Sequence, residues 1–146
     1  MVQDKTGSPP DLFLRLHVEG DPLMVRDGLR RAFQQSSLSD LGAEDRDAAE
    51  IVLAEILNNI VEHAAPGGPA LIELWLTRTG RGIFCRIEDD GKAMPDATLP
   101  PSAPPVPAAL AEGGYGWHLI RSLTENLRYQ RLHGRNRLTF IFATKQ

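Results

Sequence analysis

The chain lacks several features that would direct it to a special environment. It has one cysteine, Cys85, among 146 residues, so no internal disulfide can form and a reducing compartment suits it. No stretch approaches the roughly 20 apolar residues that a membrane span requires. The polar start of the chain also lacks an apolar segment of signal-peptide length. We therefore expect a cytoplasmic protein with no membrane partner.

The chain also has no excess of positive charge. Its 16 Lys and Arg are outnumbered by 19 Asp and Glu, which gives a net charge of −3. This balance argues against nonspecific nucleic-acid binding as the main activity, so no direct nucleic-acid partner is expected. The hydrophobic content of 42% and the charged content of 24% are ordinary for a soluble globule, and the length fits one domain.

Hydrophobic periodicity predicts alternating strands and helices. Residues 1–10 are expected to form a flexible tail, and residues 11–146 a single domain. The expected elements are strands over residues 12–18, 70–77, 82–87, 127–132 and 138–142, helices over 21–35, 43–65 and 117–124, and turns over 79–82 and 133–136. This order predicts an α+β sandwich, in which helices cover one face of a mostly antiparallel sheet.

The long helix carries a polar stripe. At about 100° per residue, Glu55 and Asn59 share one side with Asn58, Glu62 and His63, whereas most other positions are apolar. The stripe faces either solvent or a pocket, and the pattern favours neither. In a pocket, the amide oxygen of Asn59 would suit Mg²⁺. The carboxylate of Glu55, one turn away, would be able to accept a hydroxyl proton during phosphoryl transfer.

Two glycine-containing segments carry further polar chemistry. Asp89 and Gly91 follow an apolar strand, where a carboxylate can accept a hydrogen bond from an exocyclic amine and backbone can approach a flat ring; an acidic turn is the alternative. Gly114 and Gly116 precede a predicted helix, where backbone N–H groups can approach phosphate. That signal is weak alone, because glycine-rich turns are common. The chain has no GxxxxGK[ST] loop and lacks the motif set of ordinary protein kinases.

The order and spacing of these groups resemble the GHKL superfamily of ATP-binding domains, and most closely its anti-sigma-factor serine kinases. The resemblance extends from about Leu12 to Thr144. Residues 55–59, followed by a histidine at 63, are similar to the motif Glu-x-x-x-Asn. Residues 89–93 are similar to Asp-x-Gly-x-Gly, and residues 114–119 to Gly-x-Gly-x-x-Leu. The fold implied is a two-layer α/β sandwich of the GHKL type.

The resemblance implies that the chain binds ATP or ADP with Mg²⁺. Glu55 would be the catalytic base, and Asn59 would be the protein ligand of the metal. Asp89 would receive the adenine amino group, with Gly91 against the base. The cofactor-binding positions implied in addition to these two are Asn59, His63, Ala93, Gly114, Tyr115, Gly116, Trp117 and Leu119.

The sequence departs from the family pattern at two places. Ala93 stands where the Asp-x-Gly-x-Gly motif has its second glycine, and alanine is less tolerant of a positive φ. The segment that would form the ATP lid, residues 93–113, is rich in proline and poor in charge. A segment of this length with little periodicity is uncommon inside a compact domain and is often functional.

The function implied by the resemblance is a serine/threonine protein kinase that regulates transcription. Its partners would be a sigma factor and an anti-sigma-factor antagonist, and a homodimer is a further expectation. An alternative is a nucleotide-binding module that sequesters a sigma factor or another partner without transferring phosphate. A part of a larger GHKL ATPase or sensor kinase, and an unrelated α+β protein, are the remaining alternatives.

Overall fold

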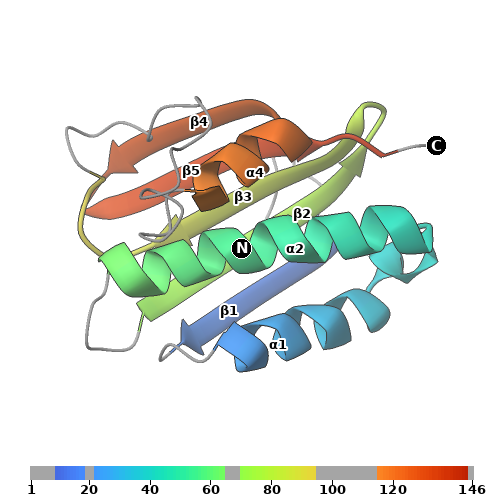
Figure 1. The fold of residues 1–146 in the computed structure, drawn as a ribbon, viewed down its shortest axis with the longest axis horizontal. Helices are drawn as coiled ribbons and strands as arrows, with labels where there is room; N and C mark the ends of the chain where they lie inside the picture. Colours follow the sequence, from blue (N-terminus) through green and yellow to red (C-terminus); the bar gives the residue numbers. More distant parts are fainter. Residues whose placement is uncertain (1–8, 19–21, 65–69, 95–114, 145–146) are drawn as a thin grey trace.

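The computed structural model describes residues 9–18, 22–64, 70–94 and 115–144. Three α-helices cover one face of a five-stranded sheet, so that the described chain forms two layers (Figure 1). No helix among the described residues is long and apolar enough to cross a membrane. The elements are β1 (Leu12–Val18), α1 (Pro22–Gln34), a 3₁₀ helix (Ser37–Asp40), α2 (Ala43–Asn59), a π-helix (Ile60–Ala64), β2 (Ala70–Thr79), β3 (Gly82–Asp89), α4 (Tyr115–Leu123), β4 (Glu125–Leu132) and β5 (Arg135–Phe142).

The sheet confirms the predicted α+β class. Its strand order is β1-β2-β3-β5-β4, and each of the four neighbouring pairs is antiparallel. The last two strands are exchanged relative to chain order, because β5 pairs with β3 and leaves β4 at the edge. This pairing sets Asp89, the last residue of β3, opposite Asn136 near the start of β5.

The core lies between the sheet and the helices. Strand alternation turns the side chains of Ile83, Cys85 and Ile87 toward α2, and all three are buried. The Cys85 thiol is packed in this core, and burial raises its pKa above its ordinary value. The helices contribute mainly aliphatic residues to the same core, namely Leu29, Val52, Leu53, Ile56, Leu57 and Ile120.

The last hairpin is tighter than the sequence predicts. His133 and Gly134 alone form the turn, and both have positive φ, 52° and 76°. Two such residues make a compact turn whose twist matches the strands, so pairing starts at once with Leu132 opposite Arg135. The prediction of a four-residue turn was therefore wrong for Arg135 and Asn136. Asn136 is a buried strand residue instead.

The long helix also differs from its prediction. It is α-helical from Ala43 to Asn59 and then widens into a π-helix from Ile60 to Ala64. Short π-helical turns interrupt α-helices frequently at functional sites. Glu55 and Asn59 still share one side, because both lie in the α-helical part. The step of 100° per residue ends at Asn59, so the expected alignment of Glu62 with the stripe no longer follows.

Candidate functional site

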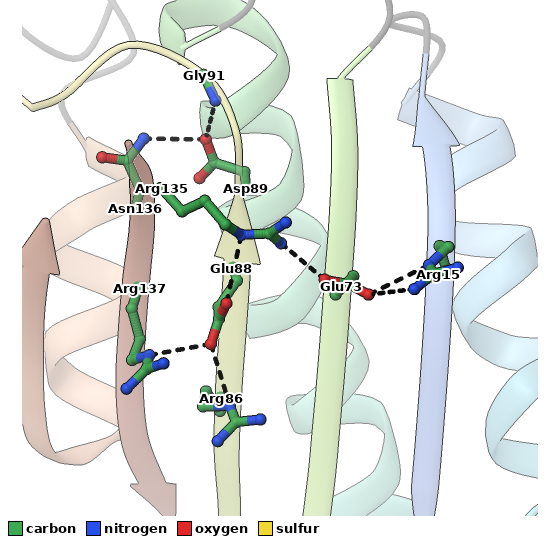
Figure 2. A network of polar contacts seen from close by, with 9 residues as sticks. All are labelled: Arg15, Glu73, Arg86, Glu88, Asp89, Gly91, Arg135, Asn136 and Arg137. Carbon is green, nitrogen blue, oxygen red and sulfur yellow. Dashed lines mark hydrogen bonds and ion pairs between the residues drawn. The ribbon is translucent and has the colours of Figure 1, made fainter. Parts of the chain in front are cut away.

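The carboxylate of Asp89 lies at the end of β3 and is almost completely buried, with 4% exposure. Its Oδ1 accepts a hydrogen bond of 2.8 Å from the backbone N–H of Gly91 and one of 2.9 Å from Nδ2 of Asn136 (Figure 2). Burial raises the pKa of Asp89, and these two hydrogen bonds oppose that rise. The group is thus an oriented acceptor that suits an exocyclic amine.

Asn136 is the residue of this site that the sequence did not indicate. Its Nδ2 also donates to the carbonyl oxygen of Lys92 at 2.8 Å, while its Oδ1 accepts from the hydroxyl of Tyr129 and from Nη1 of Arg131. Four groups therefore fix one buried amide. The pairing of β3 with β5, which creates this cluster, is a long-range contact that no local motif reveals.

The loop after Asp89 is attached to the last two strands. Arg131 donates from Nη1 to the carbonyl oxygen of Gly91 at 2.6 Å, and the N–H of Met94 donates to the Tyr129 hydroxyl at 3.0 Å. Ala93 lies between these attachments and is exposed. The first residues of the predicted lid are consequently held against β4, whereas residues 95–113 lie outside the described residues.

The carboxylate of Glu55 packs against the start of α4. A Cβ placed on Gly116 would collide with Oε1 of Glu55 and would lie 3.0 Å from its Cδ. Glycine at 116 therefore leaves space for the carboxylate in its present position, and a larger residue would require the Glu55 side chain to move. The structure therefore brings the predicted base of the first motif against the third motif, although the two lie far apart in the sequence.

Asn59 is half-buried at the last α-helical position of α2, and its Nδ2 has no hydrogen-bond partner among the residues that the structure describes. A buried amide donor without a partner needs an explanation, and an acceptor oxygen of a bound ligand would provide one. The described residues contain no cluster of three or more His, Cys, Asp or Glu side chains that would hold a metal alone. Mg²⁺ typically takes one or two protein oxygens and fills its shell with phosphate and water, so Asn59 fits that role.

The remaining predicted positions are described only in part. Trp117 is 7% exposed and belongs to the hydrophobic core, so its observed role is packing. Leu119 is half-buried on α4, and Tyr115 is the first residue of that helix. Gly114 lies outside the described residues, as does the side chain of His63. Their predicted cofactor contacts stay predictions.

The two carboxylates and the amide gather at one end of the fold. The C-terminal end of α2, the end of β3 and the start of α4 lie toward the same side in Figure 1. In Figure 2, the C-terminal end of α2 lies behind Asp89. An α+β sandwich with a strand-end carboxylate, a helix-borne carboxylate and amide, and glycine at the start of a nearby helix is the arrangement of a GHKL-type ATP-binding domain.

Comparison with known proteins identifies the family. The sequence profile of the histidine kinase-like ATPase domain matches residues 19–142. The chain therefore belongs to the histidine kinase-like ATPase family, whose members bind ATP. No curated protein matches the chain.

Two solved structures of the blue-light activated histidine kinase of Erythrobacter litoralis EL346 are similar to the chain. One, of the histidine kinase domain, has a TM-score of 0.51 at 18% identity and covers 70% of this chain and 46% of that chain. The other has a TM-score of 0.55 at 19% identity and covers 73% and 33%. The chain thus spans less than half the length of either structure, and the likeness shows a shared fold.

Proposed function

We propose that this chain is an ATP-dependent serine/threonine protein kinase that phosphorylates an anti-sigma-factor antagonist and binds a sigma factor. The observation that supports catalysis is the position of Glu55. Its carboxylate lies against Gly116, and Glu55 itself is one helical turn from Asn59 on α2. A base and a metal ligand on one helix face are the parts that phosphoryl transfer requires. A cytoplasmic location, expected from the composition, and a homodimer, expected from the resemblance, belong to the same proposal.

Each group has a defined task in this proposal. The Asp89 carboxylate accepts the hydrogen bond of the adenine amine, and Gly91 leaves room for the adenine ring. Asn59 would hold Mg²⁺ through its amide oxygen, and a bound Mg²⁺ would supply positive charge to offset that of the phosphates. The Glu55 carboxylate accepts the proton of the substrate hydroxyl as that oxygen attacks the γ-phosphorus of ATP, and the bond between this phosphorus and ADP breaks, so that ADP leaves.

The Glu55→Gln variant tests the catalytic step. Glutamine keeps the size of the side chain but cannot accept the proton, so we expect phosphate transfer to fall by about a hundredfold or more while ADP affinity changes little. Transfer of labelled phosphate from ATP to purified anti-sigma-factor antagonist domains measures the first quantity, and calorimetric titration with ADP the second. Transfer that survives the substitution would show that Glu55 is not the base.

The competing function is nucleotide-controlled binding of a partner without phosphate transfer. The exposed Ala93, in place of the second motif glycine, is the observation that favours it. ADP binding by the native chain, together with no transfer to any antagonist or sigma factor, would decide for this second function. Absence of nucleotide binding would contradict both.

A further inference from the structure

The sheet has a second face, opposite the helices, that no described helix or strand covers. We call it the open face. Strand alternation and the pairing register place one row of its side chains across all five strands, in the order Arg15, Glu73, Glu88, Arg137 and Gln130. Figure 2 views this face, with the helices behind the strands.

The open face concentrates positive charge in a chain of negative net charge. Its charged residues on β1 to β5 are five arginines and three glutamates, and it has no lysine or aspartate among the described positions of these strands. The chain as a whole has 16 Lys and Arg against 19 Asp and Glu. The five arginines are Arg15, Arg86, Arg128, Arg135 and Arg137.

Glu125 lies exposed at the sheet edge, whereas the other two carboxylates lie deeper than the arginines that surround them. The side chains of Glu73 and Glu88 are 13% and 12% exposed, whereas that of Arg15 is 63% exposed and that of Arg137 is 35% exposed. Glu88 faces three guanidinium groups, the closest being Arg137 at 2.9 Å, and Glu73 lies between Arg15 at 2.9 Å and Arg135 at 2.7 Å. A molecule that approaches this face therefore meets guanidinium groups first.

The arginines are held in place before any partner arrives. Burial alone would raise the pKa of Glu73, but the hydrogen bond from Arg15 and the charges of Arg135 and Arg15 hold it below its ordinary value, so the carboxylate stays ionised. Arg86 lies over the ring of Trp75 at 4.0 Å. Guanidinium groups that are already oriented lose little freedom when they form paired hydrogen bonds with further carboxylates.

We propose that the open face is a docking surface for a protein segment rich in Asp and Glu. A second copy of the chain would present the same arginines, and like charges would oppose that contact. A nucleic acid would bring a long polyanion against a chain whose net charge is −3, which opposes that contact. The face does not include Asp89 or Asn59, so docking does not depend on the proposed kinase activity.

Fluorescence anisotropy with a short labelled peptide of alternating Glu and Ser tests the proposal on the full chain. We expect the Arg15→Gln/Arg137→Gln variant to bind at least about tenfold more weakly, with binding that falls as ionic strength rises. Arg81→Gln is the matched control, because Arg81 has 64% side-chain exposure and an ion pair with Glu125 but lies in the β2–β3 turn. It should leave peptide affinity unchanged.

The Arg128→Gln variant distinguishes a loss of docking from a loss of folding. Arg128 is exposed and has no ion pair with any described residue, so its loss breaks no bridge and should still weaken peptide binding. Equal weakening by Arg81→Gln, or no peptide binding by the native chain, would overturn the proposal. So would tighter binding of an oligothymidylate than of the peptide, or a native dimer that the double variant converts to monomer in sedimentation.

Discussion

At the scale of single residues, the amide of Asn136 determines how Asp89 is presented. Tyr129 and Arg131 donate to its Oδ1, so its Nδ2 must face the Asp89 carboxylate and the carbonyl oxygen of Lys92. A flipped amide would set an oxygen against the carboxylate and leave both donors without an acceptor. Asn136 is therefore a positioning residue, because it would act on the adenine base only through Asp89.

The pH dependence of nucleotide binding tests this role. An adenine amine needs the ionised form of Asp89 as its acceptor. Burial already raises the pKa of Asp89, and the bond from Asn136 opposes that rise. In Asn136→Ala the pKa should rise further, so the loss of ADP affinity on acidification should begin at a higher pH than in the native chain. Calorimetric titrations across the acid range measure this shift.

Asn126→Gly is the control for that experiment. Asn126 is an exposed asparagine of β4 with a φ of 56°, a conformation that glycine accepts without strain. Its variant should keep the native pH profile. A merely structural role for Asn136 would lower ADP affinity equally at every pH, and that result would contradict its action through Asp89.

At the scale of elements, the sequence predicted what local periodicity encodes. The first strand, the first helix and the central strands lie close to their predicted ranges, because apolar residues recur at the period of each structure. Helical periodicity also predicted that Glu55 and Asn59 share one side, since both lie on one helix. The sequence did not predict the π-helix at Ile60–Ala64, because no residue type marks a widened turn.

Contacts between distant elements could not be predicted from the sequence. The cluster of Asp89 with Asn136 depends on β5 inserting beside β3, and the contact of Glu55 with Gly116 depends on how α4 packs on α2. The glycine motif indicated Gly116 as a site residue, but it predicted a contact with phosphate and did not predict the contact with the Glu55 carboxylate. Tertiary packing supplied both contacts.

The β2–β3 hairpin offers a test of the backbone at element scale. Gly82 has a φ of 137°, and a Cβ there would collide with the carbonyl oxygen of Phe142 on β5. We expect Gly82→Ala to lower the free energy of unfolding by more than about 1 kcal/mol, because the conformation and the collision both oppose it. Urea denaturation measures the change.

Gly80 lies in the turn of the same hairpin and provides the matched control. A Cβ on Gly80 would meet nothing within 4 Å. Gly80→Ala should therefore change the free energy of unfolding by no more than about 0.5 kcal/mol. Equal destabilisation by both substitutions would show that the close approach of β3 to β5 at Gly82 is not a constraint on the fold.

At the scale of the whole molecule, the two faces of the sheet carry different chemistry on the same strands. Asp89 and Asn136 turn toward the helices and the candidate nucleotide site, whereas their neighbours Glu88, Arg135 and Arg137 turn to the open face. This alternation allows one sheet to support nucleotide binding on one side and protein docking on the other. Neither proposal requires the other.

The central claim is that the chain binds ATP or ADP with Mg²⁺ at Asn59. Thermal unfolding of the native chain, of Asn59→Ala and of Asn58→Ala, each with and without ADP and Mg²⁺, tests it most directly. Asn58 is the control, because it is the preceding, equally half-buried asparagine of α2. A ligand at a hundredfold excess over its dissociation constant stabilises the folded state by about 2.7 kcal/mol.

We expect a Mg²⁺-dependent rise in the melting temperature of the native chain and of Asn58→Ala, and no such rise in Asn59→Ala. No rise in the native chain, or an equal rise in Asn59→Ala, would contradict the account.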